Sequence, residues 1–252
     1  MIVYGKNIFF LLAILVITLT SCQDNKDKLI VGTTIDNPPF SFVVANQIVG
    51  IDISIIREIE KKLDKQMIIK DMSFVELLDS VAAGKVDLAI SSITVNPERK
   101  KLVDFSIPYT SSVMTLVYKS NNHIKDLSDI EGRILGTLKG TTIAQFAHFI
   151  TIIFNCDVVE FDNNKDLVLA LNTGAVNVII VEEEVALNIV ANYTDLHSMK
   201  INNAKSDFAI ALPKKSSLTK DIDSIITVIK NDGTISKIKK RWLDNPNLMK
   251  WQ

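Results

Sequence analysis

Several residue types are scarce in this sequence of 252 residues, and each scarcity excludes a class of protein. The two cysteines, Cys22 and Cys156, are too few for the disulfide framework of a small secreted domain. His123, His148 and His197 lie outside any metal-ligand spacing, so we expect them on the surface or in loops and predict no metal or cofactor. The net charge of −1 leaves no basic footprint for nucleic acid.

Long hydrophobic runs are also scarce. Residues Ile8 to Leu19 form an apolar run that is shorter than the roughly 20 residues of a membrane-spanning helix but suits a signal-peptide core, so we predict a signal peptide at 1–21. The small residues before Cys22 resemble a bacterial lipobox, which implies a lipid on Cys22 and attachment to a membrane. An ordinary signal peptide is the alternative. Residues 22–28 then form a polar tether, and Cys156 is an unpaired, buried thiol.

Strand-like and helix-like segments alternate from Leu29 onward, which predicts an α/β protein. The helices carry apolar residues three and four positions apart, and the strands are short apolar runs. Gly84 and Gly174 stand where two helices should stop. The expected strands cover 29–31, 67–70, 86–90, 133–138, 158–161, 178–181 and 208–212, and the expected helices cover 51–63, 74–82, 143–153, 165–173, 218–230 and 234–243.

The stretch SSITVNPER, from Ser91 to Arg99, follows one of the predicted strands. Asn96 is a favoured helix N-cap and Pro97 suits the first helical position, so the stretch predicts a hydroxyl-rich turn and a helix start. In open α/β sheets, ligands bind beyond the carboxyl ends of strands, where this turn falls. Hydroxyls, backbone N–H groups and a guanidinium together suit a carboxylate. A solvated basic turn is the alternative.

A second α/β unit carries polar residues at comparable strand ends. Gly140, Thr141 and Thr142 follow one of its strands, and the strand at 178–181 ends at Glu182. If the two units face each other, an arginine in the first opposes a carboxylate in the second. That arrangement suits a zwitterion, and an α-amino acid is the obvious small molecule that carries both charges.

Other short motifs occur in a fixed order along the chain. One motif lies near the start of the chain, one at the first long predicted helix, two at and after the helix start that follows the hydroxyl-rich turn, and one near the end. They read Pro38-Pro39-Phe40, Gly50-Ile51-Asp52, Pro97-Glu98-Arg99, Val103 to Tyr109, and Asn231 to Thr234 with Trp242.

Together these motifs resemble the bacterial extracellular solute-binding proteins of family 3, which deliver polar amino acids to ABC transporters. The resemblance spans about Leu29 to Leu243. It implies a two-lobed type II periplasmic-binding-protein fold, of the Venus-flytrap kind. Lobe 1 would comprise 29–114 plus 208–252 and lobe 2 would comprise 115–207. The chain would cross between them near Leu116 and near Phe208.

The resemblance also implies roles for individual residues. Glu182 would bind the α-amino group, where the family usually has the shorter aspartate. Phe74 would pack on the ligand side chain, although it also suits the core of its own helix. Asp52 is expected to cap the helix after Gly50 rather than touch ligand. The residues implied to bind the α-carboxylate are Ser92, Thr94, Arg99 and Thr142.

Two positions depart from the family pattern and bear on specificity. Asn37 stands where an aromatic residue is common, and Thr34 stands where many members have an acid that reads the ligand side chain. A cationic side chain would therefore lack both an aromatic wall and a carboxylate, so we expect a neutral polar amino acid to bind better. Asp36 is the exception to watch, because a modest shift of its turn would bring a carboxylate into the pocket.

Two charged segments are expected to face solvent. Glu183 and Glu184 follow the proposed ammonium ligand and should lie on the exposed side of their turn. The last predicted helix is basic, and we interpret its cations as a solvated face near a helix C-terminus rather than a membrane contact.

The predicted function is that of a lipid-anchored, extracytoplasmic, monomeric receptor that captures a polar amino acid and delivers it to an ABC permease. Two alternatives remain at this point. The first is a receptor that signals ligand occupancy without transport. A neighbouring gene for a sensor alone would favour signalling, whereas neighbouring genes for an ABC permease and ATPase would favour transport. The second is a dehydratase-like enzyme on the same fold, although no nucleophile–base pair can be argued from the sequence.

Overall fold

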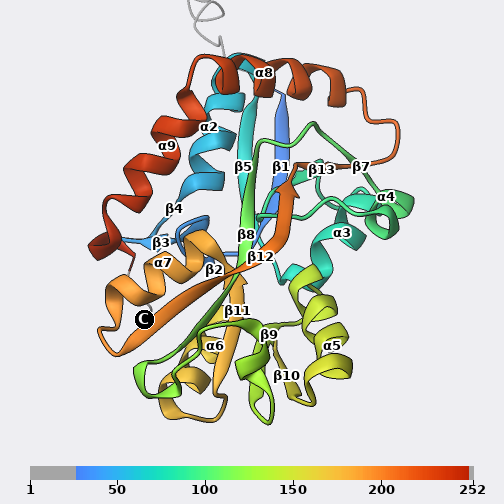
Figure 1. Cartoon of the computed structure of the whole chain (residues 1–252). Coiled ribbons are helices and arrows are strands. Elements are labelled where there is room, and N and C mark those ends of the chain that lie inside the picture. The colour runs from blue at the N-terminus through green and yellow to red at the C-terminus, as the bar shows by residue number, and fades with distance from the viewer. Residues whose placement is uncertain (1–26, 250–252) are drawn as a thin grey trace, which may run out of the picture.

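The computed structural model describes residues 27–249, and it confirms the predicted α/β class. Figure 1 shows two lobes, each built on a five-stranded sheet. None of the helices within residues 27–249 is long and apolar enough to cross a membrane. The predicted signal peptide and lipidated Cys22 lie outside the described residues.

Lobe 1, as we use the term, is the unit built on the first sheet. In spatial order its strands are β5 (Gln66–Asp71), β1 (Lys28–Thr33), β6 (Leu88–Ala89), β13 (Ala211–Leu212) and β7 (Asp104–Phe105). β1 runs parallel to β5 and β6, and β13 runs antiparallel to β6 and β7. A smaller sheet joins β2 (Asp36–Asn37), β3 (Ser41–Val44) and β4 (Gln47–Val49). The helices are α2 (Ile51–Leu63), α3 (Phe74–Ala82), α4 (Pro97–Leu102), α8 (Thr219–Asn231) and α9 (Thr234–Leu243).

Lobe 2 is the unit built on the second sheet. In spatial order its strands are β10 (Asp157–Phe161), β9 (Ile134–Leu138), β11 (Val178–Glu182), β8 (Thr110–Lys119) and β12 (Leu196–Phe208). β9 runs parallel to β10 and β11, while β8 runs antiparallel to β11 and β12. The helices are α5 (Thr142–Phe154), α6 (Asn164–Thr173) and α7 (Glu183–Asn192), with the short turns η1 (Ser120–Asn122) and η2 (Leu127–Ile130).

Two long antiparallel strands, β8 and β12, link the lobes, and Figure 1 shows them running together through the centre of the molecule. The predicted lobe boundaries, after residues 114 and 207, fall inside β8 and one residue before the end of β12. The C-terminal segment makes a further link that the sequence did not predict. The turn η3 (Pro246–Leu248) follows α9 of lobe 1 and packs on α7 of lobe 2, where Asn188 Nδ2 donates to the carbonyl of Met249 at 3.2 Å.

The local signals explain most of the elements. Helix α2 forms at the predicted residues and buries its isoleucine face, of which Ile55, Ile56 and Ile59 are fully buried. Each such side chain contributes about 1.5–3 kcal/mol of transfer free energy. Gly174 ends α6 in the left-handed conformation, and Cys156 is free and buried, so both predictions are confirmed.

Two strand predictions are corrected by the structure. The run at 86–90 pairs only at Leu88–Ala89, and the run at 208–212 is divided between the end of β12 and β13. The strands β2 to β4, β7, β8 and most of β12 were missed. β12 is an edge strand that exposes most of its residues, so its polar sequence carries no buried apolar run to reveal it.

Candidate ligand-binding site between the lobes

A small polar cavity lies between the lobes, where strand ends of the two sheets meet. Its volume is about 20 Å³, which would admit one or two water molecules but not an amino acid. Lobe 1 contributes the turns after β1 and β6, and lobe 2 contributes the ends of β9 and β11. The polar and aromatic lining residues are Thr34, Asn37, Phe74, Ser91, Ser92, Thr137, Thr141, Asn164 and Glu182.

The hydroxyl-rich turn of lobe 1 is held by a buried acid. Ser92 has a φ of 43°, which is unusual for a residue other than glycine, and its N–H donates to Asp52 Oδ2 at 2.8 Å. The hydroxyl of Tyr109 donates to Asp52 Oδ1 at 2.8 Å. Burial raises the pKa of Asp52 to about 7, against the hydrogen bonds from Ser92 and Tyr109. These contacts fix where the Ser92 side chain lies.

The expected capping role of Asp52 is therefore wrong. Gly50 is the N-cap of α2, and no side-chain hydrogen bond caps that helix. Asp52 has no exposed surface, because its position on the helix points it into the protein rather than back along the first turn. By contrast, the N-cap prediction for Asn96 is confirmed, since its side chain accepts from Arg99 N–H at 2.7 Å.

Arg99 extends from the first turn of α4 across the gap between the lobes. Its Nη1 donates to the carbonyl of Thr94 at 2.8 Å, and its Nη2 donates to the carbonyl of Gly140 in lobe 2 at 3.1 Å. The guanidinium carbon lies 5.4 Å from the centre of the Phe74 ring, which is a cation–π arrangement. Burial lowers the pKa of Arg99 to about 10, and the charge of Glu182 opposes that shift. The guanidinium therefore stays charged at neutral pH.

Lobe 2 contributes a hydroxyl and a carboxylate to the other side of the gap. Thr141 caps α5 by accepting from Ala144 N–H at 3.0 Å, and Thr142 Oγ1 donates to Thr94 Oγ1 across the gap at 3.2 Å. Glu182 ends β11, and its carboxylate accepts no hydrogen bond from another residue in the described part of the chain. Burial raises the pKa of Glu182 to about 7, and Arg99 opposes this shift. A cation placed beside Glu182 would restore its charged form.

Two buried polar atoms near the cavity have no partner among residues 27–249. They are Asn37 Oδ1 and Thr137 Oγ1. Asn37 Nδ2 donates to Ser92 Oγ at 3.2 Å, and Thr34 Oγ1 lies 3.0 Å from Ser91 Oγ. Since buried polar atoms are rarely left unpaired, these two favour a polar ligand. Sequence reasoning missed Thr137, although its place at the end of a predicted strand was available as a signal.

Asp36 lies beside the cavity but is already engaged. Its Oδ2 accepts from the N–H of Asn164, the first residue of α6 in lobe 2, at 2.8 Å. Burial raises the pKa of Asp36. The carboxylate thus serves as a contact between lobes and is not among the residues that line the cavity.

The solvent-facing prediction is wrong for Glu184, which is 4% exposed. Its Oε1 forms an ion pair with Lys239 of α9 at 2.6 Å, and its Oε2 accepts from the hydroxyl of Ser112. The reason is helical geometry, because α7 begins at Glu183 and turns the next side chain toward β8. Glu183 itself is partly exposed and pairs with Lys200. The predicted solvated face of α9 is thus interrupted at Lys239.

The eight predicted ligand-binding residues gather in one place. Five of them line the cavity, and the other three, Thr94, Arg99 and Thr142, make the adjoining contacts between the lobes. The three histidines are exposed, and no group of three or more potential metal ligands occurs within residues 27–249. The arrangement offers a cation and hydroxyls on one side and an acid on the other.

Known proteins are similar to this chain in sequence and in fold. Residues 29–245 match the profile of bacterial extracellular solute-binding proteins, family 3. The chain is 29% identical over 240 residues to the arginine-binding extracellular protein ArtP of Bacillus subtilis, covering 91% of this chain and 94% of that protein. It is 32% identical to an ancestral arginine-binding protein solved with arginine, with a TM-score of 0.81 over 86% of this chain and 98% of that one. An ancestral arginine-binding protein solved with glutamine is also 32% identical, with a TM-score of 0.79 over 86% of this chain and 98% of that one. The predicted type II periplasmic-binding-protein fold is confirmed.

Proposed function

The chain belongs to the bacterial extracellular solute-binding proteins of family 3, and from that premise we propose that its cleft captures an α-amino acid for an ABC permease. Members of the family are extracytoplasmic binding proteins that work in amino-acid transport. Accordingly, we propose a binding function without catalysis for this chain.

The observation that carries the proposal is the opposition of Arg99 and Glu182 across the gap between lobes. The guanidinium of Arg99 lies over the ring of Phe74, and Phe74 lines the same cavity as Glu182, so the two charges lie on either side of one small space. An α-amino acid would present its carboxylate to Arg99, Ser92 and Thr94 and its ammonium to Glu182. Thr142 would add a hydroxyl to the carboxylate side.

Ligand entry requires the lobes to part, because the cavity of about 20 Å³ is too small for an amino acid. The linking strands β8 and β12 are the natural hinge. On entry the ligand carboxylate would replace the Gly140 carbonyl as a partner of Arg99, and a charged acceptor binds a guanidinium more strongly than a neutral one. This exchange favours the ligand-bound, closed protein.

The test is calorimetry of the purified mature domain against the common amino acids. We expect one or a few α-amino acids to bind, and the corresponding amine and carboxylic acid, each lacking one charge, to bind far more weakly. Equal binding of either single-charge analogue would overturn the proposed two-charge recognition.

For the ligand side chain, we propose a neutral polar group over a cationic one. Thr34, Asn37 and Thr137 offer hydrogen bonds, and Glu182 is the one acid among the residues lining the cavity. The names of the relatives point in both directions. ArtP is named for arginine, which has a cationic side chain, whereas an ancestral arginine-binding protein was also solved bound to glutamine, which has a neutral one. A thermal-shift panel at equal concentration ranks the candidates. The largest rise in melting temperature with arginine or lysine would make the proposed preference wrong.

We also propose that residues 1–21 are a signal peptide and that Cys22 carries a lipid that anchors the protein to a membrane. Two or more acyl chains give stable attachment. Metabolic labelling with a fatty acid should mark the wild-type protein, and Cys22→Ser should remove the label. Labelling that persists in the variant would refute the anchor while leaving export intact.

A further inference from the structure

A second and much larger hollow opens between elements of lobe 1 and the end of the linking strand β12, separate from the amino-acid cavity. This groove has a volume of about 860 Å³. It lies between α4, β7, the end of β12 and the start of α8. Its charged lining residues are Lys100, Asp104, Lys205, Asp207, Lys214, Lys215 and Lys220.

The groove is basic although the chain as a whole is not. Five lysines and two aspartates line it, whereas the complete chain has a net charge of −1. Asp104 is already neutralised, because it pairs with Lys214 at 3.0 Å and accepts from the N–H of Lys215 at 2.7 Å. Among the described residues, no acid forms an ion pair with the ammonium groups of Lys100, Lys215 or Lys220. The free charge in the groove is therefore positive.

The start of α8 adds to this field. Its N-cap, Leu218, has no side-chain hydrogen bond to the first turn, and Ser216 accepts from the N–H groups of Leu218 and Thr219. The helix directs the positive end of its dipole toward the groove, and Asp221 in the first turn offsets part of that field. The hydroxyl oxygen of Thr219, the first residue of the helix, is buried and has no partner within residues 27–249. The hydroxyl of Thr219 and the lysines favour the same kind of ligand, an anion.

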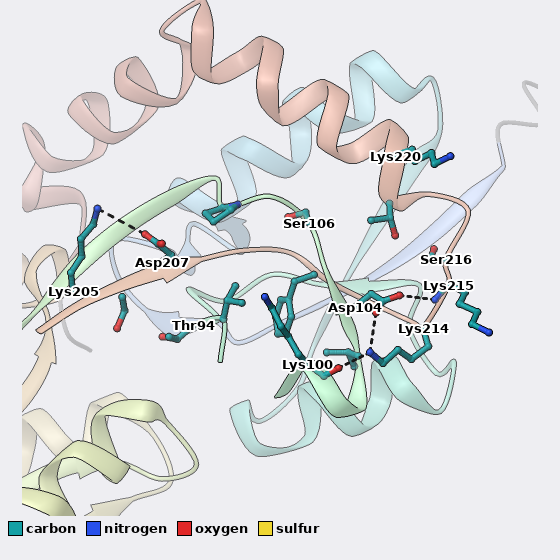
Figure 2. Close-up of a pocket in the computed structure, with 16 residues that line it drawn as sticks. Thr94, Lys100, Asp104, Ser106, Lys205, Asp207, Lys214, Lys215, Ser216 and Lys220 are labelled. Carbon is teal, nitrogen blue, oxygen red and sulfur yellow. Dashed lines mark hydrogen bonds and ion pairs between the residues drawn. The ribbon is translucent and has the colours of Figure 1, made fainter. Parts of the chain in front are cut away.

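Figure 2 shows how the charges are spread. Lys205, which is paired with Asp207 at 4.0 Å, lies at one end of the groove, Lys215 and Lys220 lie at the other, and Lys100 lies between them. Such a row suits an extended ligand with separated negative charges better than a compact anion such as phosphate. The lysines also line a concave surface, so they could not all reach a flat lipid bilayer at once.

We infer that this groove is a docking surface for an extended acidic peptide segment of a partner protein. Its glutamate and aspartate side chains would pair with the lysines, and its backbone amides would reach Ser106, Ser206 and Asp207. The inference rests on the proposed function only in naming the partner, which would be the permease. Thr94, which both Arg99 and Thr142 contact, also lines the groove, so a docked segment would lie next to the amino-acid site.

The inference is tested with fluorescein-labelled hexaglutamate, followed by fluorescence anisotropy at low ionic strength. The groove variant carries Lys100→Gln, Lys215→Gln and Lys220→Gln, and the control carries Lys85→Gln, Lys125→Gln and Lys165→Gln, which lose the same charge elsewhere on the surface. We expect the groove variant to bind the peptide about tenfold more weakly and the control to bind like the wild type. If both variants lose the same affinity for the peptide, or if neither variant loses any, the inference is wrong.

Two further measurements separate the competing explanations. If vesicles of anionic lipid bind the wild type better than the groove variant while hexaglutamate does not, the groove faces a membrane and the peptide inference is wrong. Amino-acid binding by calorimetry should be unchanged in the groove variant. If no amino acid binds the wild type but the peptide result holds, the proposed function fails and the docking surface stands.

Discussion

Glu182 and Glu184 stand two residues apart at the junction of β11 and α7, yet they belong to two different regions. Glu184 lies in what we call the hinge cluster, Thr110, Ser112, Glu184 and Lys239. There its carboxylate pairs with Lys239 at 2.6 Å and accepts from Ser112, while Lys239 also donates to Thr110 at 3.2 Å. Glu182 faces the cavity and has no such partner among the described residues. Glu184 is buried and Glu182 is partly buried, and only Glu184 has its charge paired by the protein.

The difference separates structure from function. When a buried carboxylate is paired with a cation and accepts from a hydroxyl, those two contacts offset much of the free energy lost on removing its charge from water. A buried carboxylate without a cation raises its own pKa and destabilises the folded state once it ionises. Glu182 is in the second position, with its pKa raised to about 7. The cost is removed when a cation arrives from outside, which is what an amino-acid ammonium would provide.

Removal of Arg99 should give the largest effect on the cavity side. Arg99→Ala leaves the ligand carboxylate buried without its charged partner, so binding should weaken on the order of 4 kcal/mol, near a thousandfold. Arg99→Lys should recover little, because an ammonium lacks the forked donor geometry. Calorimetry measures the affinity, and Arg241→Ala is the matched control at an exposed arginine. Near-normal affinity in Arg99→Ala would contradict the carboxylate assignment.

The hinge cluster should respond in stability instead. Glu184→Gln removes the partner of Lys239, whose side chain is 24% exposed, so the free energy of unfolding should fall by about 2–3 kcal/mol. Urea denaturation measures the loss. The double variant Glu184→Gln with Lys239→Met should recover much of it, because no unpaired charge remains. Affinity of the folded Glu184→Gln protein should stay within about threefold of wild type, and a loss as large as that of Arg99→Ala would place Glu184 in the ligand site.

Glu182→Gln should have the opposite profile, with binding lost and stability kept. The amide cannot pair with the ligand ammonium, so affinity should fall by about 2 kcal/mol. The pKa of Glu182 is raised in the folded state, so the folded protein binds the extra proton, and wild-type stability falls as pH rises from about 4.5 to about 7. Glu182→Gln removes its share of that fall, while the share of Asp52, whose pKa is also about 7, remains.

The same titration predicts pH-dependent binding. Wild-type affinity should increase from pH 5.5 to pH 8 as Glu182 loses its proton, and calorimetry in buffers of different ionisation enthalpy should detect proton release near neutral pH. Glu182→Gln should show neither behaviour. A pH dependence that survives in this variant would assign it to another group.

Sequence reasoning predicted the parts of this site that local signals encode. The N-cap Asn96, the hydroxyl-rich turn before it and Glu182 at a strand end each follow from a few neighbouring residues. Because ligands bind beyond the strand ends of an α/β sheet, these local positions indicated a polar edge in each unit. That Ser92 and Glu182 meet depended on the further assumption that the two units face each other. The resemblance to a family added the individual roles.

What could not be predicted depends on partners far apart in the chain. Asp52 meets Ser92 across 40 residues, Glu184 meets Lys239 across 55, and Asp36 meets Asn164 across 128. A polar residue next to a helix start reads as a cap or as a solvated side chain from its neighbours alone. Only the packing of the helix reveals that its side chain points inward to a distant partner.

Substitution of Asp36 should have the smallest effect on binding affinity. It also tests directly whether this acid is paired by the protein, like Glu184, or contacts the ligand, like Glu182. Its carboxylate accepts from Asn164 N–H across the lobes at 2.8 Å, so it resembles Glu184 in being satisfied by protein. If that is its whole role, Asp36→Ala should weaken binding of every ligand by about 1 kcal/mol, because one contact of the closed protein is lost. Asp36→Asn, which keeps an acceptor oxygen, should bind nearly as the wild type does. Calorimetry with glutamine and arginine decides the matter: if Asp36→Asn loses arginine and keeps glutamine, Asp36 reads a cationic ligand and belongs with Glu182.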